Sequence, residues 1–200
     1  RSMTTNKLVG IICILAGVLL AAAALLLLQN NRKEDAAAGA AAASVVQQLQ
    51  TTAPAAVPTA QPDAAGETTV PAETINGYDY IGVLEIPALN LTLPIMADWD
   101  YDRLKIAPCR QFGSVETNDL VIAGHNYKTH FGYLDQLQVG DAVNFTDVNG
   151  KVTVYHVELT SILQPDDVDA VQNSGYPLVL YSCTYSGKTR LTVFCKKYND

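Results

Sequence analysis

The stretch VNFTDVNGKVTVYHVELTSILQ, residues 143–164, decides the fold class of this 200-residue chain. Apolar runs lie on both sides of the dipeptide Asn149-Gly150, and such a dipeptide between two apolar runs is a strong signal of a β-hairpin. We therefore predict one strand over residues 143–147 and a second over residues 151–164. The hairpin indicates an antiparallel β-sheet in the C-terminal part of the chain.

Further short apolar runs, bounded by turn residues, surround this hairpin in the sequence. Helical periodicity is weak and is limited to residues 131–137 and 167–172. Seven or eight short strands in a domain of this length are typical of an all-β fold, a small closed β-barrel. Besides the hairpin, the predicted strands are residues 81–86, 91–96, 120–123, 178–182 and 189–196.

An apolar segment, residues 8–28, lies near the N-terminus and contains 21 residues without charge or proline. At about 1.5 Å per residue, a helix of this length spans roughly 31 Å, the thickness of the hydrocarbon core of a bilayer. We predict a transmembrane anchor. The alternative is a cleavable signal peptide, whose apolar region usually runs only about 7 to 15 residues.

The distribution of aromatic residues separates a folded domain from a linker. Every tyrosine, every phenylalanine and the tryptophan lie at Tyr78 or beyond, and aromatic side chains mark a core. Residues 29–74 are rich in Ala, Pro and Thr and bury too little apolar surface to fold, so we expect a flexible linker, with a transient helix over residues 36–50 as the alternative. The folded domain is expected over residues 75–200. Residues 1–7 precede the anchor, and residues 1–2, before Met3, are expected to be a remnant of cloning.

The charge of the chain excludes one class of partner. The formal net charge is −7, with 48% hydrophobic and 16% charged residues. Binding of nucleic acid requires a basic surface, which this composition does not supply. The four cysteines show neither the paired CxxC spacing of a zinc module nor the pattern of a disulfide framework.

Three residues of different chemistry lie at ends of predicted strands. Cys183 and His125 each follow an apolar run, and Arg190 begins the next strand, so a hairpin would bring Arg190 close to Cys183. A thiolate nucleophile, a histidine that donates a proton to a leaving amine and an arginine that stabilises an oxyanion suffice for acyl transfer. Taken singly, each is as typical of a structural role: a packed thiol, a core imidazole or a solvated charge.

The order and spacing of these residues resemble the sortases, the cysteine transpeptidases of Gram-positive cell surfaces. The family carries a T-L-x-T-C sequence at its nucleophile, an upstream histidine after a small residue and a glycine, and a downstream arginine. The corresponding stretch here is Val179-Leu180-Tyr181-Ser182-Cys183, in which Ser182 keeps the hydroxyl of the second threonine and Val179 replaces the first. The resemblance covers about residues 80–197. The resemblance does not distinguish between two groups of sortases, class A or D on one side and class B on the other.

The resemblance implies a sortase-like closed β-barrel of seven to eight strands with short helices. Cys183 would attack a backbone carbonyl in an LPxTG-like sorting signal of a secreted protein and form a thioacyl enzyme. His125 would act as general acid and base, and Arg190 would stabilise the oxyanion or hold the peptide. An amine of the cell-wall precursor lipid II or a pilin lysine would accept the acyl group.

The family's usual topology implies a cytoplasmic segment 1–7, a single-pass anchor in the cell membrane and an extracellular catalytic domain. Two other functions remain compatible with the same residues: a non-catalytic surface module that binds peptides or wall polymers, and hydrolysis by the thiol without transfer. Papain-like and NlpC-type peptidases fit poorly because their cysteine precedes the histidine. L,D-transpeptidases carry an S-x-G-C motif that is absent here.

The remaining cysteines and histidines favour structural roles. Cys195 shares strand parity with apolar neighbours and is expected in the core, and Cys109 is expected in a loop. His130 is expected on a surface loop and His156 half-buried on a strand. The carboxylates of Asp166, Asp167 and Asp169 cluster before the strand of Cys183, near the loop where some class A sortases bind calcium. Acids in a polar loop are usually just solvated, so we expect no cofactor, with calcium as the alternative.

Overall fold

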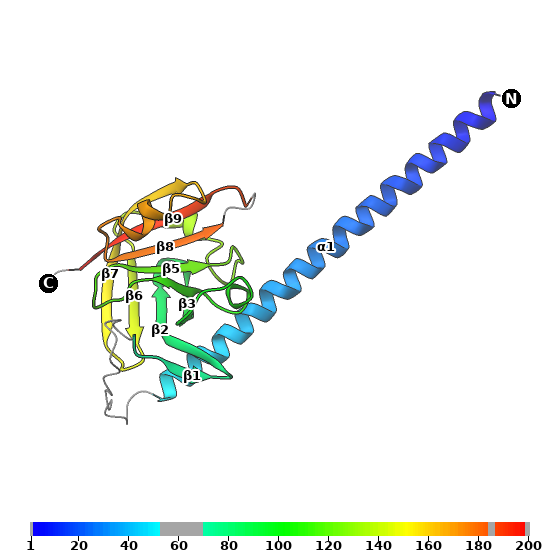
Figure 1. Ribbon diagram of the computed structural model, residues 1–200. Helices are drawn as coiled ribbons and strands as arrows, with labels where there is room; N and C mark the ends of the chain where they lie inside the picture. Colours follow the sequence, from blue (N-terminus) through cyan, green and yellow to red (C-terminus); the bar gives the residue numbers. More distant parts are fainter. Residues whose placement is uncertain (1, 53–69, 184–186, 199–200) are drawn as a thin grey trace. The chain divides into compact units, whose positions relative to one another are not determined.

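The computed structural model describes residues 2–52, 70–183 and 187–198, with side chains for 9–51, 70–182 and 187–198 (Figure 1). Three short 3-10 turns accompany the helices and strands, at Pro87–Leu89, Arg103–Lys105 and Leu134–Gln136. The helices and strands are α1 (Ser2–Thr52), β1 (Glu73–Ile75), β2 (Tyr78–Ile86), β3 (Leu91–Met96), β4 (Cys109–Phe112), β5 (Leu120–Gly124), β6 (Ala142–Asp147), β7 (Val152–Leu163), α2 (Val168–Gln172), β8 (Leu178–Cys183) and β9 (Arg190–Lys197).

The strands close into a barrel, as the sequence predicts. Their order is β1-β2-β3-β4-β5-β8-β9-β7-β6, and pairing between β2 and β6 completes the circle of β2 to β9 while β1 extends from β2. Most neighbours are antiparallel, but β5 and β8 run parallel and side by side (Figure 1). The carboxyl ends of β5 and β8 therefore lie at the same edge of the barrel.

The interior of the barrel holds one large apolar cluster. Every residue of β5 is buried, because this strand has neighbours on both sides and is covered on both faces. Such burial is the main contribution to stability, at about 25 cal/mol per Å² of apolar surface. The cluster includes Leu84, Ile86, Leu93, Ile95, Leu120, Ile122, Phe131, Leu134, Val143, Leu180, Val193 and Cys195.

The predicted strands and the hairpin are confirmed. The strands β6 and β7 pair antiparallel, with Thr146 opposite Val152 at the turn, and Gly150 adopts the positive φ of +80° that the turn requires. Two strands escaped prediction because they are short and lack clear alternation: β1 and β4. Cys109, expected in a loop, is the first residue of β4 and is fully buried, while Cys195 lies in the core as expected.

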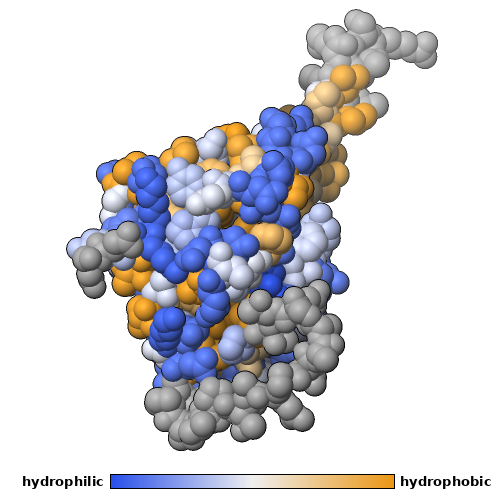
Figure 2. All heavy atoms as spheres, turned by 60° about the vertical axis from the view of Figure 1, so that its left-hand side comes forward, coloured by the Kyte–Doolittle hydropathy of each residue, from blue (hydrophilic) through white to orange (hydrophobic). Residues whose placement is uncertain are grey.

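Residues 1–37 of the chain form one compact unit, the first part of α1. The apolar side chains from Val9 to Leu28 are exposed in this unit, and the part of the helix that is visible and coloured in Figure 2 beyond the globular body is mainly hydrophobic. It is the one helix, among the described residues, that is long and apolar enough to cross a membrane by length and composition. This agrees with the predicted anchor.

The second part of α1 belongs to the other compact unit, residues 38–200. Here α1 is amphipathic: the spacing of its buried positions follows the helical repeat and forms one stripe. Val45, Val46 and Leu49 pack in a cluster with residues of β2, β3 and β4. For residues 29–52 this differs from the flexible linker expected over residues 29–74, because packing of one apolar stripe stabilises an alanine-rich helix. Residues 53–69 of that expected linker lie outside the described residues. The buried positions are Ala38, Ala42, Val45, Val46 and Leu49.

Candidate active site

The register of three neighbouring strands brings the three predicted site residues to one edge of the barrel. Cys183, the last residue of β8, is the cross-strand partner of Arg190, the first residue of β9. Ser182 pairs with Gly124, the residue that precedes His125 at the end of β5. The hairpin that the sequence predicted between Cys183 and Arg190 is therefore confirmed for the backbone. The side chain of Cys183 lies outside the described residues.

Gly124 shapes the loop that begins at His125. A Cβ atom on Gly124 would lie 2.3 Å from the ring of Phe131, a distance that no side chain tolerates. The backbone N–H of Phe131 donates a hydrogen bond to the carbonyl of His125 (3.1 Å). The loop thus folds back on itself, and the glycine before the histidine is required by packing.

His125 is half-buried and its imidazole is stacked on the ring of Tyr127, with the two ring centroids 3.8 Å apart and an interplanar angle of 25°. His130 belongs to the same loop and is only 1% exposed, which differs from the surface position expected for it. Its burial follows from the tight turn of the loop, which places its ring 5.5 Å from that of Tyr127. His156 is half-buried on β7, as expected.

A cavity of about 180 Å³ lies beside the end of the β8–β9 hairpin. Arg190 and Tyr181, two residues before Cys183 on β8, form one side of this cavity. His125 is not among its lining residues. The other lining residues come from the β3–β4 segment, from β4, from the end of β7 and from the β7–β8 connection, which includes α2: Trp99, Tyr101, Gln111, Leu163, Gln164, Pro165, Asp167, Val168 and Val171.

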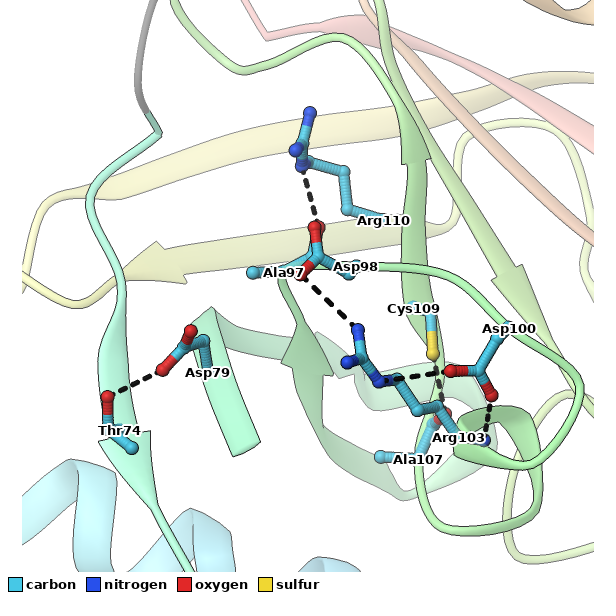
Figure 3. A network of polar contacts seen from close by, with 9 residues as sticks. All are labelled: Thr74, Asp79, Ala97, Asp98, Asp100, Arg103, Ala107, Cys109 and Arg110. Carbon is cyan, nitrogen blue, oxygen red and sulfur yellow. Dashed lines mark hydrogen bonds and ion pairs between the residues drawn. The ribbon is translucent and has the colours of Figure 1, made fainter. Parts of the chain in front are cut away.

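A polar network holds the β3–β4 segment, which carries Trp99 and Tyr101 (Figure 3). The guanidinium of Arg103 makes ion pairs with Asp98 (3.3 Å) and Asp100 (3.1 Å). The Asp100 carboxylate also accepts the backbone N–H groups of Asp102 and Arg103, both at 2.8 Å. Exposed ion pairs contribute little to stability singly, but a network with backbone hydrogen bonds fixes a conformation.

The start of the same segment, at Ala97, is hydrogen-bonded to a side chain of β4. Arg110 donates from Nε to the carbonyl of Ala97 (3.0 Å) and from Nη1 to the carbonyl of Gly113 (3.2 Å), and Figure 3 shows the first of these bonds. The rings of Trp99 and Tyr101 contact each other with centroids 5.1 Å apart. Sequence reasoning did not single out these two aromatic residues, because they lie in an acidic segment without apolar periodicity.

The two buried cysteines of the barrel are chemically unlike a nucleophile. Burial, the largest cause, raises the pKa of the Cys109 thiol to about 12. Burial likewise raises the pKa of the Cys195 thiol to about 12. Because the thiolate is the reactive form, these two residues are inert at neutral pH.

The described residues contain no group of three or more histidine, cysteine or acidic side chains that is able to hold a metal ion. Asp167 accepts the backbone N–H of Gln164 (2.8 Å), and Asp169 accepts a hydrogen bond from the side chain of Asn173 (2.5 Å). Both acids therefore make local hydrogen bonds, Asp167 within a turn and Asp169 along α2.

Comparison with known proteins agrees with this fold and arrangement. A family model described as the sortase domain matches residues 84–198, more than half of the chain. The chain belongs to the sortase family. It is 31% identical over 107 residues to Sortase D of Bacillus subtilis (strain 168), a match that covers 51% of this chain and 53% of that protein. The match thus spans about half the length of this curated relative.

Solved structures show the same barrel. A Sortase D5 transpeptidase of Clostridium perfringens superposes with a TM-score of 0.55 and 26% identity, covering 64% of this chain and 83% of that one. Sortase A of Corynebacterium diphtheriae superposes with a TM-score of 0.54 and 22% identity, covering 62% of each chain. At that identity, the second likeness concerns the fold alone.

Proposed function

We propose that this chain is a membrane-anchored cysteine transpeptidase in which Cys183 is the nucleophile, His125 the general acid and base, and Arg190 the oxyanion-stabilising or substrate-holding group. The observation that carries the proposal is the strand register. It pairs Cys183 with Arg190 and places the residue before His125 opposite Ser182, next to a cavity lined by Arg190. Membership in the sortase family supports the same assignment.

In the first half of the reaction, the Cys183 thiolate attacks the carbonyl carbon of the scissile peptide bond. The carbonyl oxygen takes up negative charge, which the guanidinium of Arg190 stabilises. The C–N bond then breaks, His125 transfers a proton to the departing amine, and the acyl group remains on sulfur as a thioester.

In the second half, an amine attacks the thioester carbonyl and His125 accepts the proton that this amine loses. The C–S bond breaks and returns Cys183 as the thiolate, so that atoms and charges balance over the cycle. The division into two steps is the advantage of covalent catalysis. The acceptor amine belongs to the cell-wall precursor lipid II or to a pilin lysine.

The substrate is an LPxTG-like sorting signal of a secreted protein. The cavity supports this class because most of its lining residues are apolar or aromatic. The polar ones are the two amides Gln111 and Gln164, the acid Asp167 and the cation Arg190. Apolar side chains of an extended peptide fit such a wall, while amides and a cation bind backbone carbonyls. The segment 8–28 anchors the enzyme in the cell membrane, and the catalytic domain is extracellular.

The test uses the full chain in detergent with a library of fluorogenic LPxTG-type peptides, each with and without an added amine. We expect cleavage that yields an amine-linked product and that Cys183→Ala abolishes. Cys195→Ala, which removes an inert thiol, is the matched control. Cleavage by water alone, whatever amine is added, would make the protein a thiol hydrolase. No cleavage across the library, with Cys183 unreactive towards a thiol-directed substrate analogue, would favour the peptide-binding module.

A further inference from the structure

In the loop after β5, the ring of Tyr127 contacts the imidazoles of two histidines, His125 and His130. The Tyr127 ring stacks nearly parallel on the imidazole of His125 at 3.8 Å between centroids, and its contact with the buried ring of His130 is tilted by 56° at 5.5 Å. The tight stack is therefore with the residue that the proposed reaction uses.

The backbone of Tyr127 gives this ring little freedom. Its carbonyl accepts two hydrogen bonds, from the N–H of His130 (3.0 Å) and from the N–H of Gly132 (2.8 Å). A Cβ atom on Gly132 would lie 2.7 Å from the same carbonyl, so the turn tolerates only glycine there. A carbonyl held twice in a closed turn fixes the backbone of Tyr127, and so the position from which its ring reaches His125.

The loop is also packed against the second part of α1. A Cβ atom on Gly39 would lie 2.8 Å from the methyl group of Thr129, so helix and loop are in close contact at this point. Ala42, one turn further along α1, belongs to the same apolar cluster as Phe131, the residue that closes the loop. The helix thus limits how far the loop that carries Tyr127 is able to move.

We propose that Tyr127 is a positioning residue: its ring holds the imidazole of His125 in the orientation needed for proton transfer. The inference rests on the proposed function, in which His125 gives and takes a proton. An imidazole without neighbours rotates about two side-chain bonds, and stacking over its face restricts that rotation. The ring face also interacts favourably with the imidazolium that forms when His125 takes up a proton.

The chain supplies a matched comparison. The rings of His156 and Tyr198 form a second histidine–tyrosine contact, with centroids 5.0 Å apart, and Tyr198 follows the end of β9 that is opposite to Arg190. Tyr198→Leu therefore makes the same chemical change as Tyr127→Leu at a pair outside the site.

The experiment measures kcat and KM for peptide cleavage by the full chain carrying Tyr127→Leu, Tyr127→Met, Tyr127→Phe or Tyr198→Leu. Loss of the ring should lower kcat about 10- to 100-fold, the size expected from misplacement of a catalytic group, with KM changed less than about twofold. Tyr127→Phe keeps the ring and should restore kcat to within about threefold. Tyr198→Leu should leave both constants unchanged.

A spectroscopic measurement accompanies the kinetics and does not depend on activity. The ring protons of His125, observed by NMR after selective histidine labelling, should be shifted upfield by the stacked ring. They should move downfield in Tyr127→Leu and Tyr127→Met, and stay in place in Tyr127→Phe. These spectra also report whether each variant is folded.

The outcomes separate the two proposals. An unchanged kcat in a folded Tyr127→Leu or Tyr127→Met variant overturns the positioning role. An equal loss in Tyr127→Phe also overturns it and assigns the effect to the hydroxyl. If the parent protein cleaves no peptide, the proposed function fails, and the His125 resonances alone then decide whether the stack holds the imidazole.

Discussion

The interior of the barrel and the cavity at its edge are built from different side chains. Inside, Leu84, Ile95 and Val193 are at most 1% exposed and belong to one cluster of buried apolar residues. At the edge, Trp99 is 39% and Tyr101 70% exposed, and amides, an acid and Arg190 share the wall with apolar groups. On the face that Figure 2 shows, hydrophilic and hydrophobic side chains are interspersed in the same way. The difference indicates that stability is concentrated in the interior and chemistry at the edge, so substitutions should affect one without the other.

Arg190→Ala should give the largest effect and should act on the edge alone. The two hydrogen bonds recorded for its guanidinium go to backbone carbonyls of Gly187 (3.5 Å) and Thr189 (3.4 Å), so its removal costs little stability. Loss of an oxyanion donor should lower kcat/KM about 10²- to 10³-fold. The control is Lys196→Ala on the same strand, which breaks only an exposed ion pair with Glu158. An Arg190→Ala variant with the parent's kcat/KM would contradict the separation.

Leu49→Ala tests whether the second part of α1 belongs to the interior. Its side chain is 8% exposed within a cluster that includes Val83 and Met96. The substitution should lower the free energy of unfolding of the domain by about 2–3 kcal/mol, at the lower end for a buried leucine. Urea unfolding followed by Trp99 fluorescence measures this. Leu19→Ala, in the exposed apolar segment, should leave the value unchanged, and equal effects of both would show that residues 38–52 do not stabilise the barrel.

The buried thiols predict a dependence of stability on pH. Burial raises the pKa of Cys109 and Cys195 to about 12, while a thiol in the unfolded chain titrates at about 8.5. Above pH 9 the folded protein therefore keeps protons that the unfolded chain loses, so stability falls as the pH rises. Between pH 8 and pH 10 we expect a loss of about 2 kcal/mol per thiol.

Urea unfolding midpoints at the two pH values measure this loss. Cys109→Ala and Cys195→Ala should each reduce the change in the free energy of unfolding between these pH values. A pH dependence of stability that neither substitution changes would contradict the prediction. Alkylation at pH 8, mapped by mass spectrometry, should leave both thiols unmodified in the folded protein.

Tyr155→Phe should have the smallest effect and sharpens the description of the interior. The hydroxyl of Tyr155 is buried and has no hydrogen-bond partner among the described residues, and burial raises its pKa. Its removal should change the free energy of unfolding by less than about 1 kcal/mol, in the stabilising direction, because an unsatisfied polar group is lost. A loss of stability above that size, measured by urea unfolding, would reveal a partner outside the described residues.

Local pattern was sufficient for the strands with clear alternation or a strong turn, such as β6 and β7 around Asn149-Gly150. It was insufficient for β4, whose four residues CRQF are stabilised by pairing with β3 and β5 rather than by their own preference. The stripe Ala38, Ala42, Val45, Val46 and Leu49 was present in the sequence. It was overlooked because alanine is a weak hydrophobic signal, and its burial depends on the barrel surface that receives it.

The candidate residues Cys183, His125 and Arg190 were accessible from the sequence because their order along the chain resembles a family motif. The prediction of a surface position for His130 was wrong. Polar neighbours in the sequence do not reveal that the loop turns inward and buries the imidazole. Trp99 and Tyr101 became candidates only through the cavity that they line.

The sequence by itself determined the strand-rich domain and the apolar N-terminal segment, since these follow from periodicity, length and composition. It supplied Cys183, His125 and Arg190 as candidates through their resemblance to a family motif. The tertiary structure alone decided which strands are neighbours. It places β5, which is followed by His125, beside β8, which ends at Cys183, although these two residues are 58 positions apart in the chain. It also decided that the Tyr127 ring stacks on His125 and that residues 38–49 pack against the barrel. The physical reason is that these contacts join segments whose own preferences are neutral, and only the closed barrel makes them favourable.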